Sequence, residues 1–258
     1  MLQRYREGSA MQWKPLSAFA IATVTAMGCG GGGASTDKSG SGTAYSFVAP
    51  VPGVVRILSE TIVDNSNNTI DIGYSDTAGT VNSDGSYGAL VQSTSGESAI
   101  VNGTNYAVVT QNENYDDSGQ ELSYSFTAAS GVLVTCTYTP HASGPDFPVE
   151  VGQTWQIEFT LACDNGAAQI SYTQQGSVVG VESVTVPAGA FTALKFQSTV
   201  NWTDAAGTVR NESTTNWRDT KTLYSVKQEI SIAVSGTAPA NGYAVSRTIE
   251  LESISDAP

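Results

Sequence analysis

The sequence predicts an all-β fold in which an antiparallel meander forms a curved half-barrel or a closed barrel. Apolar and polar residues alternate with a period of two in segments that recur about every 12 residues, with turn-forming residues between them. No segment after residue 45 has a convincing helical period. Connections are short, so consecutive strands should pair antiparallel. A sandwich of two sheets is the alternative.

The clearest strands form a hairpin over Val181–Trp202. Pro187 has the fixed φ that opens a turn, and Gly189 can adopt the positive φ that closes it. In the second strand one face is apolar and the other polar, as in a strand with one buried face. The apolar face carries Leu194, Phe196, Val200 and Trp202.

The remaining strands follow from the same alternation. They are expected over residues 54–63, 69–74, 87–91, 104–111, 121–128, 132–139, 153–163, 168–172, 209–217, 224–234 and 243–254. The longest irregular stretch in the middle, Pro140–Gly152, contains three prolines and is expected to divide two halves of one curved sheet.

The N-terminus predicts export and a lipid anchor. Residues 1–28 combine a basic start with an apolar run that is too short to span a bilayer, which is typical of a signal peptide. The sequence Ala26-Met27-Gly28-Cys29 resembles the end of a bacterial lipoprotein signal, where the cysteine becomes acylated. This resemblance implies a lipid on Cys29 and, because Gly30 is not an aspartate, sorting to the outer membrane.

Domain boundaries follow from composition. Residues 29–44 are rich in Gly and Ser and predict a flexible tether. Residues 45–258 are expected to form a single β domain.

The charge distribution excludes nucleic-acid binding. The chain has a formal net charge of −13, and no Lys or Arg occurs between Arg56 and Lys195, an interval that contains 15 acidic residues. Such a surface repels phosphate backbones, whose binding depends on basic contacts. The expected partners are the membrane, through the lipid anchor, and an apolar ligand or a protein.

Two cysteines are expected to form a disulfide. With Cys29 assigned to lipidation, Cys136 and Cys163 are left as a pair in an oxidising compartment. Both lie on the apolar face of their predicted strands, so both can point into one core.

No motif indicates catalysis, a metal or a cofactor. The single histidine, His141, lies in a loop without a nucleophile motif. The acidic residues Asp116, Asp117 and Glu121 resemble solvated turn carboxylates more than a calcium site. We therefore expect no catalytic residues, no metal and no cofactor, with a hydrolase of envelope glycans as an alternative because a carboxylate pair is possible in principle.

Three segments resemble secreted bacterial proteins that contain domains of unknown function. V-T-V-P-A-G-A-F-T-A-L-K-F (Val184–Phe196) resembles their V-P-A-G-x-F hairpin, Phe147–Trp155 is similar to their P-L-x-V-G-x-x-W strand opening, and Leu223–Lys227 matches a later strand. The resemblance implies a curved antiparallel sheet in the cell envelope, similar to the half-barrels of lipoprotein carriers, which bind acyl chains.

The large set of inward apolar residues leads to a prediction about function. If the sheet of ten or more strands does not fold into a filled sandwich, its concave apolar face should stay open and bind a ligand. The cleft is expected between the Trp155 strand and the Leu194–Trp202 strand, lined by Trp155, Phe159, Leu194, Phe196, Trp202 and Trp217. A structural lipoprotein with a filled core is the alternative. A turn at Asp204–Gly207 would place Trp202 opposite Val209 and Trp217 opposite Leu194, with both tryptophans on one face.

Overall fold

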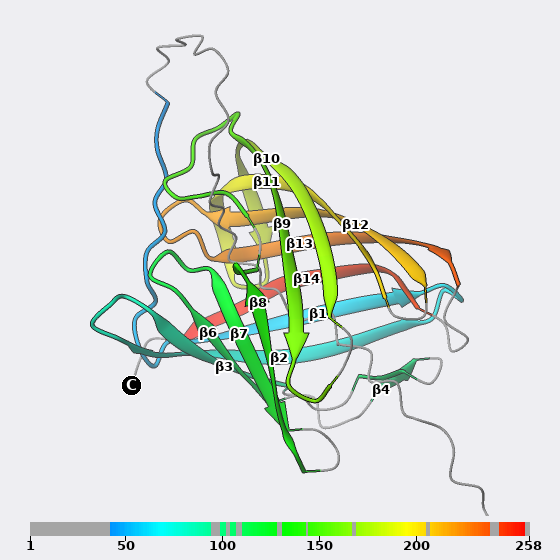
Figure 1. The fold of residues 1–258 in the computed structure, drawn as a ribbon. Coiled ribbons are helices and arrows are strands. Elements are labelled where there is room, and N and C mark those ends of the chain that lie inside the picture. The colour runs from blue at the N-terminus through cyan, green and yellow to red at the C-terminus, as the bar shows by residue number, and fades with distance from the viewer. Residues whose placement is uncertain are drawn as a thin grey trace, which may run out of the picture.

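A computed structural model describes residues 42–93, 99–101, 104–106, 110–127, 131–142, 144–166, 169–204, 207–237 and 243–255. Twelve strands form a closed antiparallel barrel in the order β1-β14-β13-β12-β11-β10-β9-β8-β7-β6-β3-β2 (Figure 1). The predicted all-β barrel is confirmed, and the two-sheet sandwich is not formed by the described strands.

The barrel is a meander closed by its first and last strands. Each strand pairs with its neighbour in the chain, β1 pairs with β14, and β3 pairs with β6 because a separate two-stranded hairpin lies between them in sequence. The barrel strands are β1 (Val55–Asp64), β2 (Thr69–Val81), β3 (Tyr87–Ser93), β6 (Thr110–Tyr115), β7 (Glu121–Thr127), β8 (Leu133–Thr139), β9 (Thr154–Cys163), β10 (Ile170–Val186), β11 (Gly189–Thr203), β12 (Thr208–Asp219), β13 (Ser225–Gly236) and β14 (Ala244–Ser255). The separate hairpin consists of β4 (Ala99–Val101) and β5 (Thr104–Tyr106).

Four turns of the barrel share one hydrogen-bond pattern. The amide of the first residue donates to the carbonyl four residues later, and the amide of the fourth residue donates back to the first carbonyl. The fourth residue has a positive φ in every case, which places it in the left-handed region. These turns begin at Asp64, Asn82, Asp116 and Asp204. In the last of them Gly207 has a φ of 80°, and the closing pair is Asp204 and Thr208.

This turn corrects the predicted register of Trp217. Only three residues separate Asp204 from Thr208, so Trp202 lies opposite Arg210 and Trp217 lies opposite Lys195. The prediction assumed a loop of four residues, Asp204–Gly207, which shifts the register by one residue. Such a shift moves every side chain of a strand to the other face. Trp217 therefore lies on the outer face of the barrel, in a row with Lys195 and Lys227.

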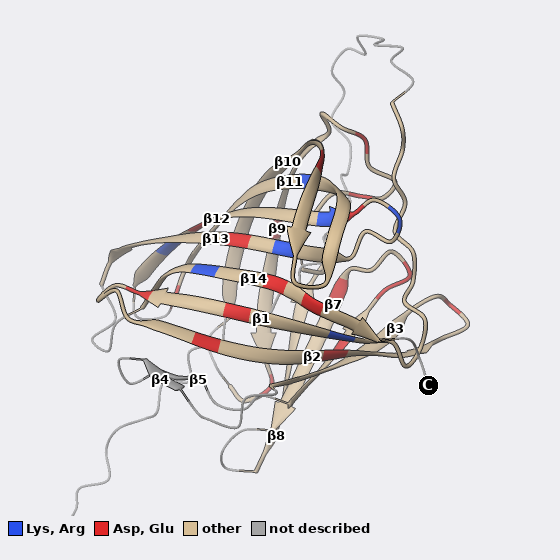
Figure 2. Cartoon of the chain, turned by 180° about the vertical axis from the view of Figure 1, so that it is seen from behind, with Lys and Arg blue, Asp and Glu red and all other residues tan. Residues whose placement is uncertain are grey.

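The end of the β10–β11 hairpin covers this tryptophan. The hairpin folds back over the outside of β12 and β13 (Figure 2), and the Ala188 amide donates to the Leu251 carbonyl of β14 at 3.0 Å. The Trp217 indole N–H donates to Glu182, and the Lys195 ammonium lies 5.2 Å from the ring centroid. Trp217 is consequently only 8% exposed although it lies outside the barrel.

Three packed clusters fill the described structure. The first joins residues of β1, β2, β12, β13 and β14 with the β10–β11 hairpin, and it includes Leu58, Ile72, Trp217, Ile230 and Leu251. The second contains Val149, Trp155, Val178, Leu194, Phe196 and Leu223. The third contains Tyr124, Val134, Cys136, Tyr138, Ala142, Phe159 and Leu161.

The predicted disulfide is present. Cys136 of β8 and Cys163 of β9 are directly opposite each other in the register and are bonded within the third cluster. The bond closes a chain segment with a sequence separation of 27.

The ring of Trp155 requires a glycine on the neighbouring strand. Gly176 lies opposite Trp155, and a Cβ atom at residue 176 would lie 2.3 Å from Trp155 Cζ2 and 2.7 Å from the Gln197 carbonyl oxygen. We expect Gly176→Ala to lower the free energy of unfolding by about 1–3 kcal/mol, the usual cost of overpacking a core.

Gly180→Ala on the same strand is the matched control, because a Cβ atom there has no neighbour within 4 Å. Urea unfolding of both variants checks the prediction. Equal stability of the two variants would show that Trp155 does not pack as described.

Candidate functional site: a chamber beneath the strap

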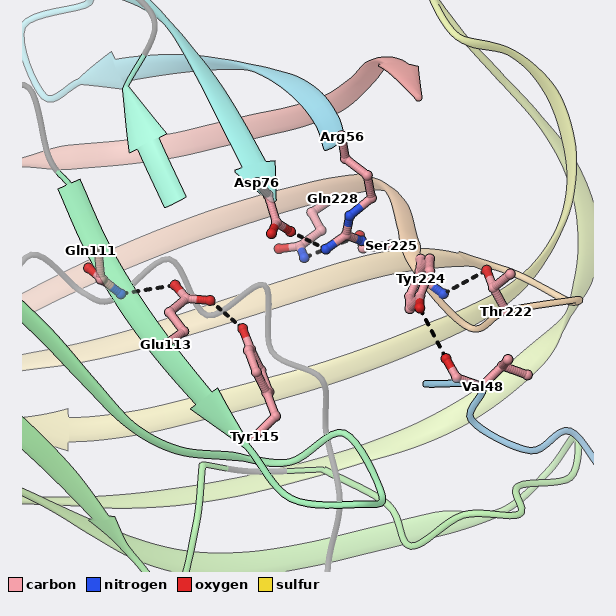
Figure 3. Close-up of polar contacts among 10 residues, drawn as sticks. All are labelled: Val48, Arg56, Asp76, Gln111, Glu113, Tyr115, Thr222, Tyr224, Ser225 and Gln228. Atoms are coloured by element: carbon pink, nitrogen blue, oxygen red, sulfur yellow. Dashed lines mark hydrogen bonds and ion pairs between the residues drawn. The ribbon is translucent and has the colours of Figure 1, made fainter. Parts of the chain in front are cut away.

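One end of the barrel is crossed by residues 42–54, which we call the strap (Figure 1). Tyr45 forms an antiparallel bridge with Val149, and each amide donates to the other's carbonyl at 2.8 Å. The Tyr224 hydroxyl donates to the Val48 carbonyl at 3.1 Å (Figure 3). The strap is thus fastened both to the proline-rich segment 140–152 and to the β12–β13 connection.

An aromatic ring of the strap closes this end of the barrel. The Phe47 ring stacks on Tyr87 with 6.1 Å between centroids, and it lies 6.1 Å from Phe147 and 6.2 Å from Tyr224. Gly119 allows this approach, since a Cβ atom there would lie 2.6 Å from the ring. The prediction that segment 140–152 divides two halves of the sheet is wrong, because β8 and β9 on its two sides pair directly. The segment packs with the strap instead.

A small chamber bordered by both polar and apolar residues lies beneath the strap. Its cavity volume is about 30 Å³, which is room for roughly two water molecules. Aromatic, charged and small residues border it, namely Pro50, Val54, Arg56, Asp76, Ala78, Tyr87, Ala89, Tyr115, Arg218, Leu223, Tyr224 and Ser225.

Arg56 and Asp76 form a buried ion pair in the chamber wall (Figure 3). The two residues are opposite each other in the β1–β2 register, so their side chains point to the same side of the sheet. The Arg56 guanidinium also lies over the Tyr224 ring, 4.7 Å from its centroid. Burial alone would lower the pKa of Arg56, but the neighbouring Asp76 carboxylate outweighs burial and raises it.

Two further carboxyl groups are buried inside the barrel. Glu113 accepts a hydrogen bond from Gln111 at 2.9 Å and another from the Tyr115 hydroxyl (Figure 3). Burial, followed by the charge of Asp76, raises the pKa of Glu113 to about 8. Glu121 is 0% exposed and neither carboxyl oxygen has a hydrogen-bond partner. Burial and then Glu113 raise its pKa well above the usual range.

The burial of Glu121 shows that the interpretation of the acidic turn residues as solvated is wrong for this residue. A bulge shifts the β6–β7 register between Asn114 and Tyr115, so Tyr115 lies opposite Glu121 and not opposite Leu122. The carboxyl group therefore enters the barrel beside Tyr115. Simple alternation along the strand cannot locate such a bulge, which adds one residue to one strand.

Arg218 is a candidate functional residue that the sequence did not reveal. It lies opposite Leu194, is 1% exposed and borders the cavity. None of its three side-chain nitrogens has a hydrogen-bond partner, and its guanidinium lies 5.3 Å from the centroid of the Phe196 ring. Burial lowers the pKa of Arg218 to about 10, so the side chain stays charged at neutral pH.

The six residues of the predicted cleft are distributed among packed regions. Trp155, Leu194 and Phe196 share the second cluster, Phe159 belongs to the third, and Trp217 belongs to the first. The Trp202 ring packs against Tyr172 with 5.4 Å between centroids. All six are at most 9% exposed, and β10 lies between β9 and β11. The cleft stays a prediction, and a ligand there would have to displace packed side chains.

The buried carboxyl groups are not accessible to a large substrate. Glu113 and Glu121 are 1% and 0% exposed, so a glycan chain has no direct approach to either carboxyl group. Within the described ranges, no three His, Cys, Asp or Glu side chains lie close enough together to hold a metal ion. That part of the chain also contains no helix long and apolar enough to cross a membrane.

No protein-family model matches the chain, and no curated protein is significantly similar to it in sequence. Solved structures do align with it. A protein of Bacteroides fragilis, described as exported and as having a YmcC-like fold, covers 83% of this chain and 100% of its own, with 14% identity and a TM-score of 0.50.

A protein of Parabacteroides distasonis described as a lipoprotein covers 82% of this chain and 99% of its own, with 13% identity and a TM-score of 0.49. A protein of Escherichia coli described as the lipoprotein YmcC covers 78% of this chain and 85% of its own, with 13% identity and a TM-score of 0.37. At such identities a likeness shows the fold alone, so the chain has a fold similar to that of the Bacteroides fragilis protein.

Proposed function

We propose that this protein is a non-catalytic lipoprotein of the cell envelope, anchored in the outer membrane through a lipid on Cys29. The Cys136–Cys163 disulfide carries the proposal, because disulfides persist in oxidising compartments outside the cytoplasm. The chain has three cysteines, so this pairing leaves Cys29 for acylation. The described export of the Bacteroides fragilis protein with a similar fold supports the same location.

The strap gives the proposed anchor a direction. Only 12 residues, 30–41, separate Cys29 from the strap in the sequence, so the strapped end of the barrel would be the end nearest the membrane. Val48, Val51 and Val151 on the strap and on segment 140–152 are 48%, 63% and 51% exposed. Apolar side chains of this kind are suited to a membrane-proximal position.

The packed interior favours a scaffold or protein-binding role over the transport of an acyl chain. A carrier needs apolar space for its cargo, whereas the described apolar side chains pack into three clusters and the cavity beneath the strap has a volume of only about 30 Å³. We therefore favour the structural lipoprotein with a filled core, which presents its outer surface to a protein partner.

The anchor is tested by metabolic labelling. Radioactive palmitate is expected to label the wild type and the Cys136→Ala/Cys163→Ala variant but not Cys29→Ala, because only Cys29 becomes an N-terminal acylated cysteine. Cys29→Ala should also leave the membrane fraction, since acyl chains provide the membrane affinity. Equal labelling of wild type and Cys29→Ala would overturn the proposal.

A further inference from the structure

The positive charge of Arg218 has no neutralising partner among the residues that the structure describes. The residue is 1% exposed and borders the cavity beneath the strap, and its guanidinium lacks any hydrogen-bond partner. Leaving a buried charge unpaired is costly, because desolvation removes the water that stabilised the ion. The cation–π contact with Phe196 offsets part of this cost but supplies no hydrogen-bond acceptor.

The other ionisable groups around the chamber do not supply the missing negative charge. Asp76 is bonded to Arg56, so this pair is neutral as a unit. Burial raises the pKa of both Glu113 and Glu121, which favours their neutral forms, and neither residue borders the cavity. Arg218 is thus a charged residue of the cavity wall without an ion-pair or hydrogen-bond partner among the described residues.

We propose that the chamber binds a small monovalent anion of the size of chloride, with the Arg218 guanidinium as its main hydrogen-bond donor. A cavity of about 30 Å³ has room for roughly two waters and therefore for such an ion, but not for a hydrated sulfate or phosphate. Water could accept the hydrogen bonds of Arg218, whereas an anion would also neutralise its charge. The strap residues Pro50 and Val54 border the cavity, so binding would also favour the strapped conformation.

Thermal unfolding in two sodium salts tests this site. A ligand that binds only the folded state raises the Tm in proportion to the logarithm of its concentration once it exceeds the Kd. With ionic strength held constant by sodium gluconate, replacing gluconate by chloride is expected to raise the Tm of the wild type in this way. Arg218→Met should abolish the chloride response.

Arg210→Met is the matched control. Arg210 lies on the same strand, opposite Trp202, and does not border the cavity, so its replacement should leave the chloride response intact. Identical Tm values of the wild type in chloride and gluconate would show that the chamber holds only water. A chloride response that survives in Arg218→Met would place the site elsewhere.

A second measurement uses the wild type alone and does not depend on the folding of a variant. Crystals soaked in sodium bromide are expected to show an anomalous scattering peak beside the Arg218 guanidinium. A chamber without that peak, in crystals that show bromide at other positions, would contradict the proposal.

Discussion

Replacing both Cys136 and Cys163 by alanine is expected to lower the free energy of unfolding by about 3.5 kcal/mol, which is the value that loss of loop closure predicts for a loop of this length. The bond closes a loop with a sequence separation of 27 and joins two directly paired strands, β8 and β9. For a domain of this size, a loss of that magnitude corresponds to a Tm decrease of roughly 7–14 °C. Chemical denaturation of both proteins measures the difference.

Reduction of the wild type provides the control for this variant. The reduced wild type should lose nearly as much stability as Cys136→Ala/Cys163→Ala, because both lose the same cross-link and each substituted side chain is small. Reductant should leave the stability of the double variant unchanged. A loss below about 1 kcal/mol in both cases would indicate that the unfolded chain is not restrained as the loop-closure model assumes.

The buried carboxyl groups should make the protein less stable as the pH rises above 4.5. Glu113 and Glu121 have raised pKa values in the folded state, so between pH 4.5 and about 8 the folded protein binds more protons than the unfolded chain. Stability then decreases with increasing pH by up to about 1.4 kcal/mol per pH unit for each such group. The contribution is fully present below pH 4.5 and is lost as the pH rises through the folded-state pKa.

Glu121→Gln isolates the contribution of one group. Glutamine has nearly the same shape and cannot ionise, so the variant should show a shallower decrease in stability between pH 5 and pH 8, measured by urea unfolding at fixed ionic strength. Glu158→Gln is the matched control, because Glu158 is an exposed glutamate on β9. An unchanged slope in Glu121→Gln would show that this carboxyl group is already ionised in the folded protein.

The sequence was informative where local periodicity decides structure. Alternation located most of the strands of the barrel, and the apolar parity of Cys136 and Cys163 predicted the disulfide. The predicted strands over 168–172 and at the start of the Val181 hairpin are one continuous strand, β10, because the polar Gln174 of their connection is buried and points inward. A buried polar residue breaks the hydrophobic pattern without breaking the strand.

The candidate site depends on features that one-dimensional patterns cannot supply. Arg218 points into the barrel because three residues, and not four, separate Asp204 from Thr208 in the β11–β12 turn. Glu121 points into the barrel because of the bulge in the β6–β7 pair. Each feature shifts the register of its strand pair by one residue. The strap closes the chamber through contacts between Phe47 and Tyr224, which are far apart in the sequence. Cys29 lies outside the described residues, so its lipidation still rests on the sequence alone.

The intact mass of the protein extracted from membranes without reductant tests the central claim most directly. The account predicts a chain that begins at Cys29, carries acyl groups on that residue and lacks the two hydrogens that the Cys136–Cys163 bond removes. A mature chain with an unmodified Cys29 thiol, recovered from a soluble fraction, would contradict it.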